Sequence, residues 1–250
     1  MPESSLQKIA FITGGNRGLG YQTAHDLGSL GITVVIGSRD AAKGEQAAAA
    51  LRAAGVDAQS LKFDVTDPAD HTAAFDFFQS RYGRLDILIN NAGYAEVEFG
   101  SGKLPSVSET APASLKKHFD INFFDQVTLT QALLPLLLAA PAARIVNLSS
   151  ILGSLTLHAD PKSPIYHSKA FAYDASKTAL NSFTVHLAYD LRATKIKVNS
   201  AHPGWVKTDM GGPNAMMEVS EGGKTSAQLA TLSADGPTGG FFHLGQALPW

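Results

Sequence analysis

The chain contains no cysteine. It therefore has no disulfide framework, no thiol nucleophile and no zinc–thiolate site, which is compatible with a reducing cytoplasm. Charge is also scarce: charged residues make up 17% of the chain, and the net charge at pH 7 is -2. A chain so close to neutrality lacks the basic surface that nucleic acid or an anionic membrane selects, so neither is expected as a partner.

Targeting, membrane and metal-binding signals are missing as well. The first eight residues hold no basic segment followed by an apolar run, so no signal peptide is expected. The most apolar stretch, residues 129–143, contains Pro135 and Pro141 and is shorter than the ~20 residues of a spanning helix. We expect it to be a buried helix end, and the protein to be soluble and cytoplasmic. The histidines lack metal-ligand spacing and no G-x-S-x-G elbow is present, which disfavours a metal site and a hydrolase.

What the chain does contain is an alternation of short apolar runs with helix-compatible segments. An apolar fraction of 44% suits one globular domain over residues 1–250, and we find no linker or internal repeat. Strands are expected at residues 8–13, 33–39, 59–65, 85–91, 144–149, 195–201 and 240–244. Helices are expected up to about residue 30, at 41–54, from 68, at 109–139 and at 171–194. This order predicts a doubly wound α/β fold with a mainly parallel seven-stranded sheet, which binds ligands beyond the carboxyl ends of its strands.

A glycine-rich loop joins the first expected strand to the first expected helix. Its sequence runs Gly14-Gly15-Asn16-Arg17-Gly18-Leu19-Gly20. A plain tight turn is the ordinary explanation of such glycines. Strand, glycine loop, helix and strand together are instead typical of a dinucleotide-binding Rossmann fold, where the pyrophosphate lies at the helix N-terminus.

The end of the second expected strand indicates which dinucleotide. An NAD site places a carboxylate there, whereas an NADP site needs a cation for the 2′-phosphate. This chain has Ser38-Arg39, with Arg17 in the glycine loop, so we predict NADP(H). Asp40 follows at once, and we expect it to cap the next helix. The alternative for Arg39 is a plain surface charge.

Tyr173 and Lys177 are four residues apart in an expected helix, a spacing that places both on one face. A tyrosine with a pKa of about 10 is a reluctant acid or base at neutral pH. A nearby ammonium favours the phenolate and would lower that pKa towards working pH. By itself the spacing is weak evidence, and a solvated lysine over a packed tyrosine is its ordinary explanation.

Taken together, the motifs resemble the short-chain dehydrogenase/reductase family over essentially the whole chain, most closely its NADPH-dependent carbonyl reductase branch. The matching segments are Thr13 to Gly20, Asp64-Val65, Asn90-Asn91-Ala92-Gly93, Asn122, Ser149-Ser150, Tyr173-x-x-x-Lys177 and Pro203-Gly204.

The resemblance implies four catalytic residues. Tyr173 would be the general acid that protonates the carbonyl oxygen, and Lys177 would hold the nicotinamide ribose and lower the Tyr173 pKa. Ser150 would hydrogen-bond the substrate oxygen. Asn122 would hold a water that relays protons to Lys177.

The resemblance also implies the cofactor contacts. Gly14, Gly18 and Gly20 would bind the pyrophosphate, and Arg17 and Arg39 the 2′-phosphate. Asp64 would contact the adenine, Asn91 the ribose on the adenosine side, and Thr208 the carboxamide. The remaining implied contacts, besides Tyr173 and Lys177, are Asn16, Leu19, Ser38, Val65, Ala92, Gly93, Pro203, Gly204 and Val206.

The segment before Tyr173 departs from the family pattern. Twenty-two residues separate Ser150 from Tyr173, which implies an insertion of roughly ten residues. We expect the insertion, about residues 154–168, to form part of the substrate wall or a lid. Tyr166 and Lys169 within it have the wrong spacing for the motif. A second substrate loop is expected at about residues 205–226.

These features predict an NADPH-dependent enzyme that reversibly reduces ketones or aldehydes to alcohols. An NAD-linked secondary-alcohol dehydrogenase is one alternative, and a non-catalytic NADP(H)-binding sensor on the same fold is another. The oligomeric state is open between monomer, dimer and tetramer. Assembly in this family commonly uses the two long helices, here residues 109–139 and 171–194.

Overall fold

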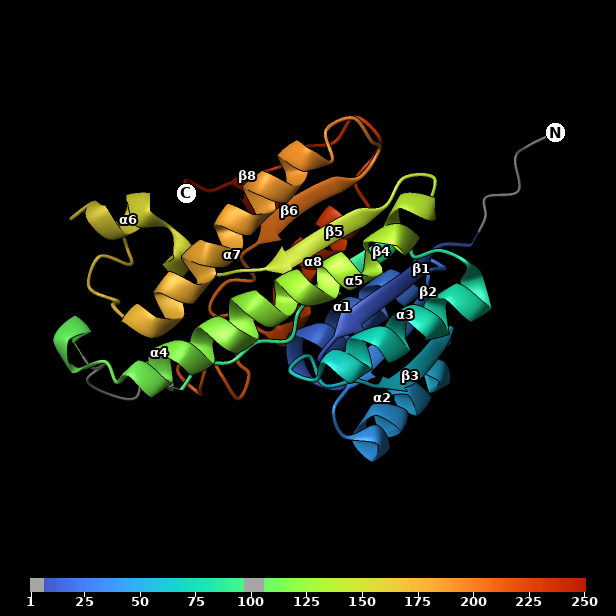
Figure 1. The fold of residues 1–250 in the computed structure, drawn as a ribbon. Helices are drawn as coiled ribbons and strands as arrows, with labels where there is room; N and C mark the ends of the chain where they lie inside the picture. Colours follow the sequence, from blue (N-terminus) through green and yellow to red (C-terminus); the bar gives the residue numbers. More distant parts are fainter. Residues whose placement is uncertain (1–6, 97–105) are drawn as a thin grey trace.

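A computed structural model describes residues 7–96 and 106–250 (Figure 1). Its eight-stranded sheet has the order β3-β2-β1-β4-β5-β6-β7-β8. Neighbouring strands from β3 to β7 pair parallel, and β8 alone pairs antiparallel. The strands are β1 (Ile9–Thr13), β2 (Thr33–Ser38), β3 (Ala58–Lys62), β4 (Ile87–Asn90), β5 (Arg144–Leu148), β6 (Lys197–Ala201), β7 (Phe241–His243) and β8 (Gln246–Ala247).

Helices cover both faces of this sheet, and β1 shows why. Its residues are all buried, so alternate side chains enter two different cores. Phe11 packs with α3 (Pro68–Tyr82), α5 (Asp125–Ala139) and α7 (Phe171–Asp190), whereas Ile12 packs with α1 (Gly18–Gly28), α2 (Ala41–Ala53) and α8 (Val219–Ala230). Figure 1 shows α3, α5 and α7 side by side on one face. The predicted doubly wound α/β fold is therefore confirmed.

The eighth strand was not predicted. After β7 the chain turns at Leu244 and Gly245, whose φ angles are 45° and 81°. Two residues of positive φ match the twist of a tight hairpin, which returns the chain antiparallel to β7. The predicted count of seven strands is corrected to eight, because a two-residue strand is too short to leave an apolar pattern.

The predicted helix over residues 109–139 has a more detailed structure. Residues Val107–Glu109 form a 3-10 turn (η1), and the helix itself begins at Pro112 as α4 (Pro112–Phe119). A π-helical turn, η2 (Asp120–Phe124), then connects α4 to α5 without a break. Insertion of a π turn rotates the residues that follow it, and such turns are frequent at functional sites.

The two segments expected to border the substrate are partly helical. The insertion begins after the 3-10 turn η3 (Ile151–Gly153) and contains the short helix α6 (Leu155–Ala159). Residues 219–226, the end of the second expected loop, form the first two turns of α8. Gly222 lies so close to α1 that a Cβ atom there would approach Leu19 Cδ2 to 2.6 Å.

Among the described residues one helix, Pro112–Ala139, is long and apolar enough to cross a membrane by length and composition alone. Leu129, Leu133, Leu136 and Leu137 of this helix are buried in the core beneath it. These contacts make it one of the core helices of the α/β domain.

Candidate active site

Four of the predicted residues meet beyond the carboxyl ends of β4 and β5. Ser150 follows β5, and Tyr173 and Lys177 lie on the first two turns of α7. Asn122 lies in the π turn between α4 and α5. All four are at most 9% exposed. The fold thus collects residues from three separate segments into one buried cluster.

Tyr173 forms a side-chain hydrogen bond with Ser150. Burial raises the pKa of Tyr173 above its ordinary value of 10; the Ser150 hydrogen bond opposes this shift, and the charge of Asp174 adds to it. The phenol is therefore held in its protonated, proton-donating form. This direction differs from the lowering expected from Lys177, because desolvation of the phenolate is the largest cause of the shift.

Lys177 is buried beside the tyrosine ring. Its Nζ donates to Leu148 O at 2.8 Å and lies 5.7 Å from the centroid of the Tyr173 ring. Burial lowers the Lys177 pKa to about 8. Gly93 adjoins this ammonium: a Cβ atom there would make ordinary van der Waals contacts, 3.6 Å from Nζ and 3.4 Å from Asn122 Oδ1.

Asn122 connects this cluster to the segment after β4. Its Oδ1 accepts from Tyr94 N at 2.8 Å, and its Nδ2 donates to Tyr94 O at 2.9 Å and to Ser176 Oγ at 3.0 Å. Ser176 Oγ in turn donates to Tyr173 O at 2.7 Å. The side chain of Asn122 therefore positions both the Gly93–Tyr94 segment and the catalytic turn of α7.

The two adjacent serines differ in their contacts. Ser150 contacts Tyr173, and its Oγ accepts from Leu152 N at 3.2 Å as the cap of η3. Ser149 is 2% exposed, and its Oγ has no hydrogen-bond partner within the described part of the chain. Ser150 is the serine that can reach a substrate oxygen beside the phenol.

The glycine loop has the geometry of a pyrophosphate cradle. Gly14 and Gly18 have φ angles of 64° and 54°, which favour glycine. A Cβ atom on Gly20 would lie 2.5 Å from Gly14 O, so the helix start and the loop touch. Among the described residues no side chain caps α1, whose N-cap is Arg17. Its first amides are thus available to an anion, and this arrangement fits a dinucleotide.

Other predicted cofactor residues support this loop from the neighbouring strand. Asn91 Nδ2 donates to Thr13 O at 2.7 Å and to Gly14 O at 3.2 Å. Thr13 Oγ1 accepts from the amides of Asn91 and Ala92 at 3.0 and 2.9 Å. Thr13 is a positioning residue: it lies within the glycine-loop segment that matches the family pattern, but the sequence predicted no role for it.

The region expected to bind the 2′-phosphate is only partly free for that role. Ser38 is buried and donates to Asp40 O at 2.8 Å, while Arg39 is exposed. Asp40 caps α2, as predicted, by accepting from Lys43 N at 3.0 Å. Arg17 forms an exposed ion pair with Asp209. A phosphate at this position would compete with Asp209 for the Arg17 guanidinium.

The segments after β3 and β6 complete the edge of the sheet. Asp64 Oδ1 accepts from Thr66 N at 3.0 Å, with Val65 next to it. Gly204, after Pro203, has a φ of 94° and lies against Met217. Val206 forms an isolated bridge with Met217, and Thr208 Oγ1 accepts from Gly211 N at 3.1 Å. A Cβ atom on Gly18 would lie 3.6 Å from Thr208 Cγ2, so this segment covers the glycine loop.

His202 has a structural role beside the site. Its Nδ1 accepts from Ile151 N at 3.2 Å and from Gly204 N at 3.4 Å, so it joins the ends of β5 and β6. Burial lowers its pKa to about 3, and the neighbouring His243 contributes to the shift. The imidazole is therefore neutral, in agreement with a structural histidine rather than a proton shuttle.

A cavity of about 320 Å³ adjoins Tyr173 between α4 and the start of α7. His118 in its wall is held by Ser114 O at 2.8 Å from Nδ1 and by Glu96 N at 3.2 Å from Nε2. The remaining lining is mostly of small residues but includes two glutamates; it consists of Glu96, Glu109, Thr110, Ala111, Ala113, Ser114, Ala170, Phe171 and Ala172. The cavity offers space for an organic molecule next to the phenol.

Comparison with known proteins agrees with this geometry. Residues 8–218 match the family model described as short chain dehydrogenase. The mouse protein Carbonyl reductase [NADPH] 1 is 30% identical, with 99% of this chain and 100% of that protein covered. A (+)-neomenthol dehydrogenase of Arabidopsis thaliana is 32% identical, with 94% and 95% covered.

Solved structures show the same likeness. The NADPH-bound carbonyl reductase from chicken fatty liver superposes with a TM-score of 0.82 at 27% identity, over 98% of this chain and 99% of that chain. The family model, the relatives and the fold agree with the motifs at the sheet edge. The chain is thus an oxidoreductase of the short-chain dehydrogenase/reductase family, belongs to its carbonyl reductase-like branch, and uses a nicotinamide cofactor.

Proposed function

We propose that this enzyme uses NADPH to reduce ketones or aldehydes to alcohols, and catalyses the reverse oxidation as well. The observation that carries the proposal is the buried cluster in which Ser150 hydrogen-bonds Tyr173 while Lys177 lies against the tyrosine ring. A non-catalytic sensor has no use for a phenol so placed, and the intact cluster favours an enzyme.

The residues divide the work as follows. NADPH, when bound, supplies the hydride. Ser150 holds the carbonyl oxygen and stabilises the negative charge that develops on it. Tyr173 donates its proton to that oxygen, which suits a phenol that burial keeps protonated. Lys177 lies within reach of both Tyr173 and Gly93, and supplies positive charge as the tyrosine loses its proton.

NADPH is proposed over NADH on the strength of Arg17 and Arg39 at the start of α1 and the end of β2, where Asp40 is engaged as a helix cap. The glycine loop would hold the pyrophosphate, with Asp64 and Asn91 on the adenosine side and Thr208 over the loop. Relatives whose names include NADPH support the same choice.

The cavity between α4 and α7 is proposed to receive part of the substrate. Its small, mostly apolar lining beside Tyr173 fits a hydrocarbon portion attached to the carbonyl carbon. No residue of the insertion or of 205–226 lines this cavity, and both segments are proposed to border other parts of the substrate site within a single domain. A cytoplasmic location completes the proposal, which leaves the oligomeric state open between monomer, dimer and tetramer.

The test is NADPH consumption with a panel of ketones and aldehydes, run beside NADH and beside Tyr173→Phe. We expect turnover with NADPH that the variant loses, while NADPH binding, followed by fluorescence, is retained. Full activity of Tyr173→Phe would overturn the mechanism. Tight NADPH binding without turnover of any carbonyl would favour the sensor.

A further inference from the structure

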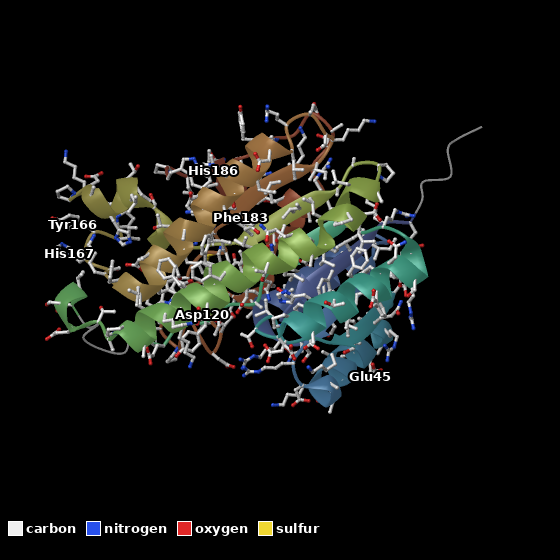
Figure 2. The ribbon with its side chains drawn as sticks, in the orientation of Figure 1. Glu45, Asp120, Tyr166, His167, Phe183 and His186 are labelled. Atoms are coloured by element: carbon white, nitrogen blue, oxygen red, sulfur yellow. The ribbon has the colours of Figure 1, made fainter. Side chains whose placement is uncertain are left out.

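The insertion is anchored at both of its ends by one lysine and one histidine. Lys169, just before α7, donates through Nζ to His158 O at 2.8 Å and contacts His158 Nδ1 at 3.0 Å. The same ammonium lies 5.0 Å from the centroid of the Tyr166 ring. Figure 2 shows Tyr166 and His167 near α6 at the outer end of the molecule. The insertion therefore closes on itself next to the start of α7.

The contacts of His158 determine its tautomer. An ammonium can only donate, so Nδ1 accepts from Lys169 and the proton of the neutral ring resides on Nε2. The Nε2–H donates to Leu152 O at 2.9 Å, and Nε2 lies 3.4 Å from Asp174 Oδ2. Burial lowers the His158 pKa, and the charge of Lys169 acts in the same direction, which keeps the ring neutral.

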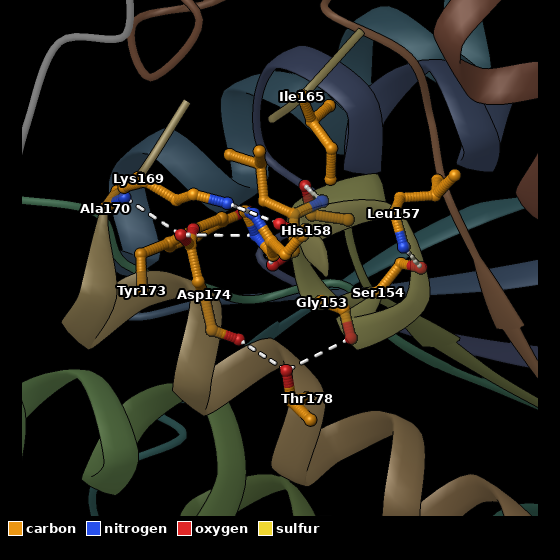
Figure 3. A network of polar contacts seen from close by, with 12 residues as sticks. Gly153, Ser154, Leu157, His158, Ile165, Lys169, Ala170, Tyr173, Asp174 and Thr178 are labelled. Carbon is orange, nitrogen blue, oxygen red and sulfur yellow. Dashed lines mark hydrogen bonds and ion pairs between the residues drawn. The ribbon is translucent and has the colours of Figure 1, made fainter. Parts of the chain in front are cut away.

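Asp174 lies on α7, one residue after Tyr173, and is the residue of this helix that His158 contacts. It is 7% exposed, and its Oδ2 accepts from Ala170 N at 2.8 Å, where the helix begins. Its Oδ1 has no hydrogen-bond partner within the described part of the chain. One turn further, Thr178 Oγ1 donates to Asp174 O at 3.0 Å and to Gly153 O at 3.1 Å. Figure 3 shows these contacts joining the insertion, η3 and α7.

We propose that Asp174, through its contacts with His158 and the Ala170 amide, is a positioning residue of the reaction: it holds the first turn of α7, and with it Tyr173, against the insertion. A buried carboxylate next to the general acid that does not line the substrate cavity is unexplained by catalysis or cofactor binding. Its contacts instead account for how a segment absent from the plain family pattern is coupled to the catalytic helix. The inference rests on the proposed function.

The charge of the Asp174 carboxylate affects the pKa of the Tyr173 phenol. Burial raises the Asp174 pKa to about 7, with the Ala170 hydrogen bond and the charge of Lys169 opposing the shift. The described titratable groups that face it are His158 on α6, Lys169 before α7 and Tyr173 on α7 itself. Ionised Asp174 raises the pKa of Tyr173. Removal of this charge therefore makes Tyr173 the stronger acid.

The experiment compares Asp174→Asn with Asp174→Ala. Asparagine can still accept from Ala170 N but carries no charge, whereas alanine loses both properties. During alcohol oxidation the phenolate is the base, so activity rises with pH as Tyr173 ionises. We expect this rise to occur at lower pH in Asp174→Asn than in the wild type. Asp174→Ala should lose on the order of tenfold or more in kcat at similar KM, and asparagine should restore it.

Asp190→Asn is the matched control, since it removes an exposed carboxylate from the far end of α7 and should change neither quantity. Lys169→Met should lower kcat in the wild type yet change little in the Asp174→Ala background, because the residues act as one network. Identical pH profiles for wild type and Asp174→Asn, or a kcat that asparagine does not restore, would overturn the proposal.

A readout independent of activity separates this proposal from the proposed function. The folded-state pKa of about 7 lies above the ordinary value of 3.8 for an aspartate, so Asp174 stabilises the fold least at high pH. The Tm of Asp174→Asn minus the Tm of the wild type should therefore be larger at pH 8 than at pH 5. The same Tm difference at both pH values would overturn the network, whatever the activity. If the Tm difference changes with pH as expected but the wild type shows no turnover, the proposed function and the positioning role are both overturned. The network would then be structural only.

Discussion

Replacement of Asn122 by alanine is expected to lower stability and activity together. The side chain is fully buried and makes three hydrogen bonds, to both backbone groups of Tyr94 and to Ser176. Ser176 keeps its bond to Tyr173 O, so the cost falls on the Tyr94 amide and carbonyl. With each orphaned group costing ~1–3 kcal/mol and some water entering, we expect a loss of about 2–4 kcal/mol.

For a protein of this size that loss corresponds to a fall in Tm of roughly 5–15 °C, measured by circular dichroism or calorimetry. Turnover should fall at temperatures where the variant is still folded, because the Gly93–Tyr94 segment beside Lys177 is no longer held. Asn122→Asp, of equal volume, should also destabilise, since its second oxygen would face Tyr94 O.

Asn181→Ala is the matched control for this prediction. Asn181 is also a buried asparagine, 3% exposed, but makes a single hydrogen bond, from Nδ2 to Gly153 O at 3.3 Å. We expect it to cost only about 1 kcal/mol. Equal Tm values for the two alanine variants would refute the reasoning, because the number of hydrogen bonds would then not determine the loss.

Three other substitutions test the cofactor region and the packing behind Lys177. Arg39→Asp should weaken NADPH binding by roughly 10- to 100-fold, as expected for loss of a charge-assisted contact, and NADH far less; equal effects on both in a fluorescence titration would remove the phosphate-binding role. Asp209→Asn frees Arg17 from an exposed ion pair worth at most about 1 kcal/mol, so NADPH should bind up to about fivefold more tightly with NADH unchanged; weaker NADPH binding would contradict this. Gly153→Ala places a Cβ atom 2.9 Å from the backbone carbon of Lys177, which should shift α7 and lower kcat by on the order of tenfold with NADPH affinity retained. If Gly153→Ala keeps the wild-type kcat, the close contact is relieved by a movement of η3 and not of α7.

The local features of the chain were accessible from sequence because each depends on nearby residues. The apolar run of β1 followed by a glycine loop is a local pattern, and its consequence, a strand that turns into α1, is confirmed. The helix expected from residue 68 is likewise confirmed, because Asp67 caps it and Pro68 stands in its first turn, both of which act locally. The spacing of Tyr173 and Lys177 on one helical face likewise follows from helix geometry alone.

Other features depend on contacts between distant segments. The π turn that contains Asn122 has no local signature in the sequence. The Asn122 side chain bonds Tyr94, which lies in the distant segment after β4. The ion pair of Arg17 with Asp209 spans 192 residues of sequence. The upward shift of the Tyr173 pKa was missed for the same reason, since it follows from burial.

By itself, then, the amino-acid sequence determined the order of strands and helices, the glycine loop and the residues able to carry out the chemistry. Only the tertiary structure decided how those residues are held: how deeply Tyr173 and Lys177 are buried, and that the insertion reaches Asp174. The physical reason is the separation along the chain over which each kind of interaction acts. Capping, turn chemistry and helical periodicity act over a few residues, whereas desolvation and hydrogen-bond partners are set by whatever the fold brings near.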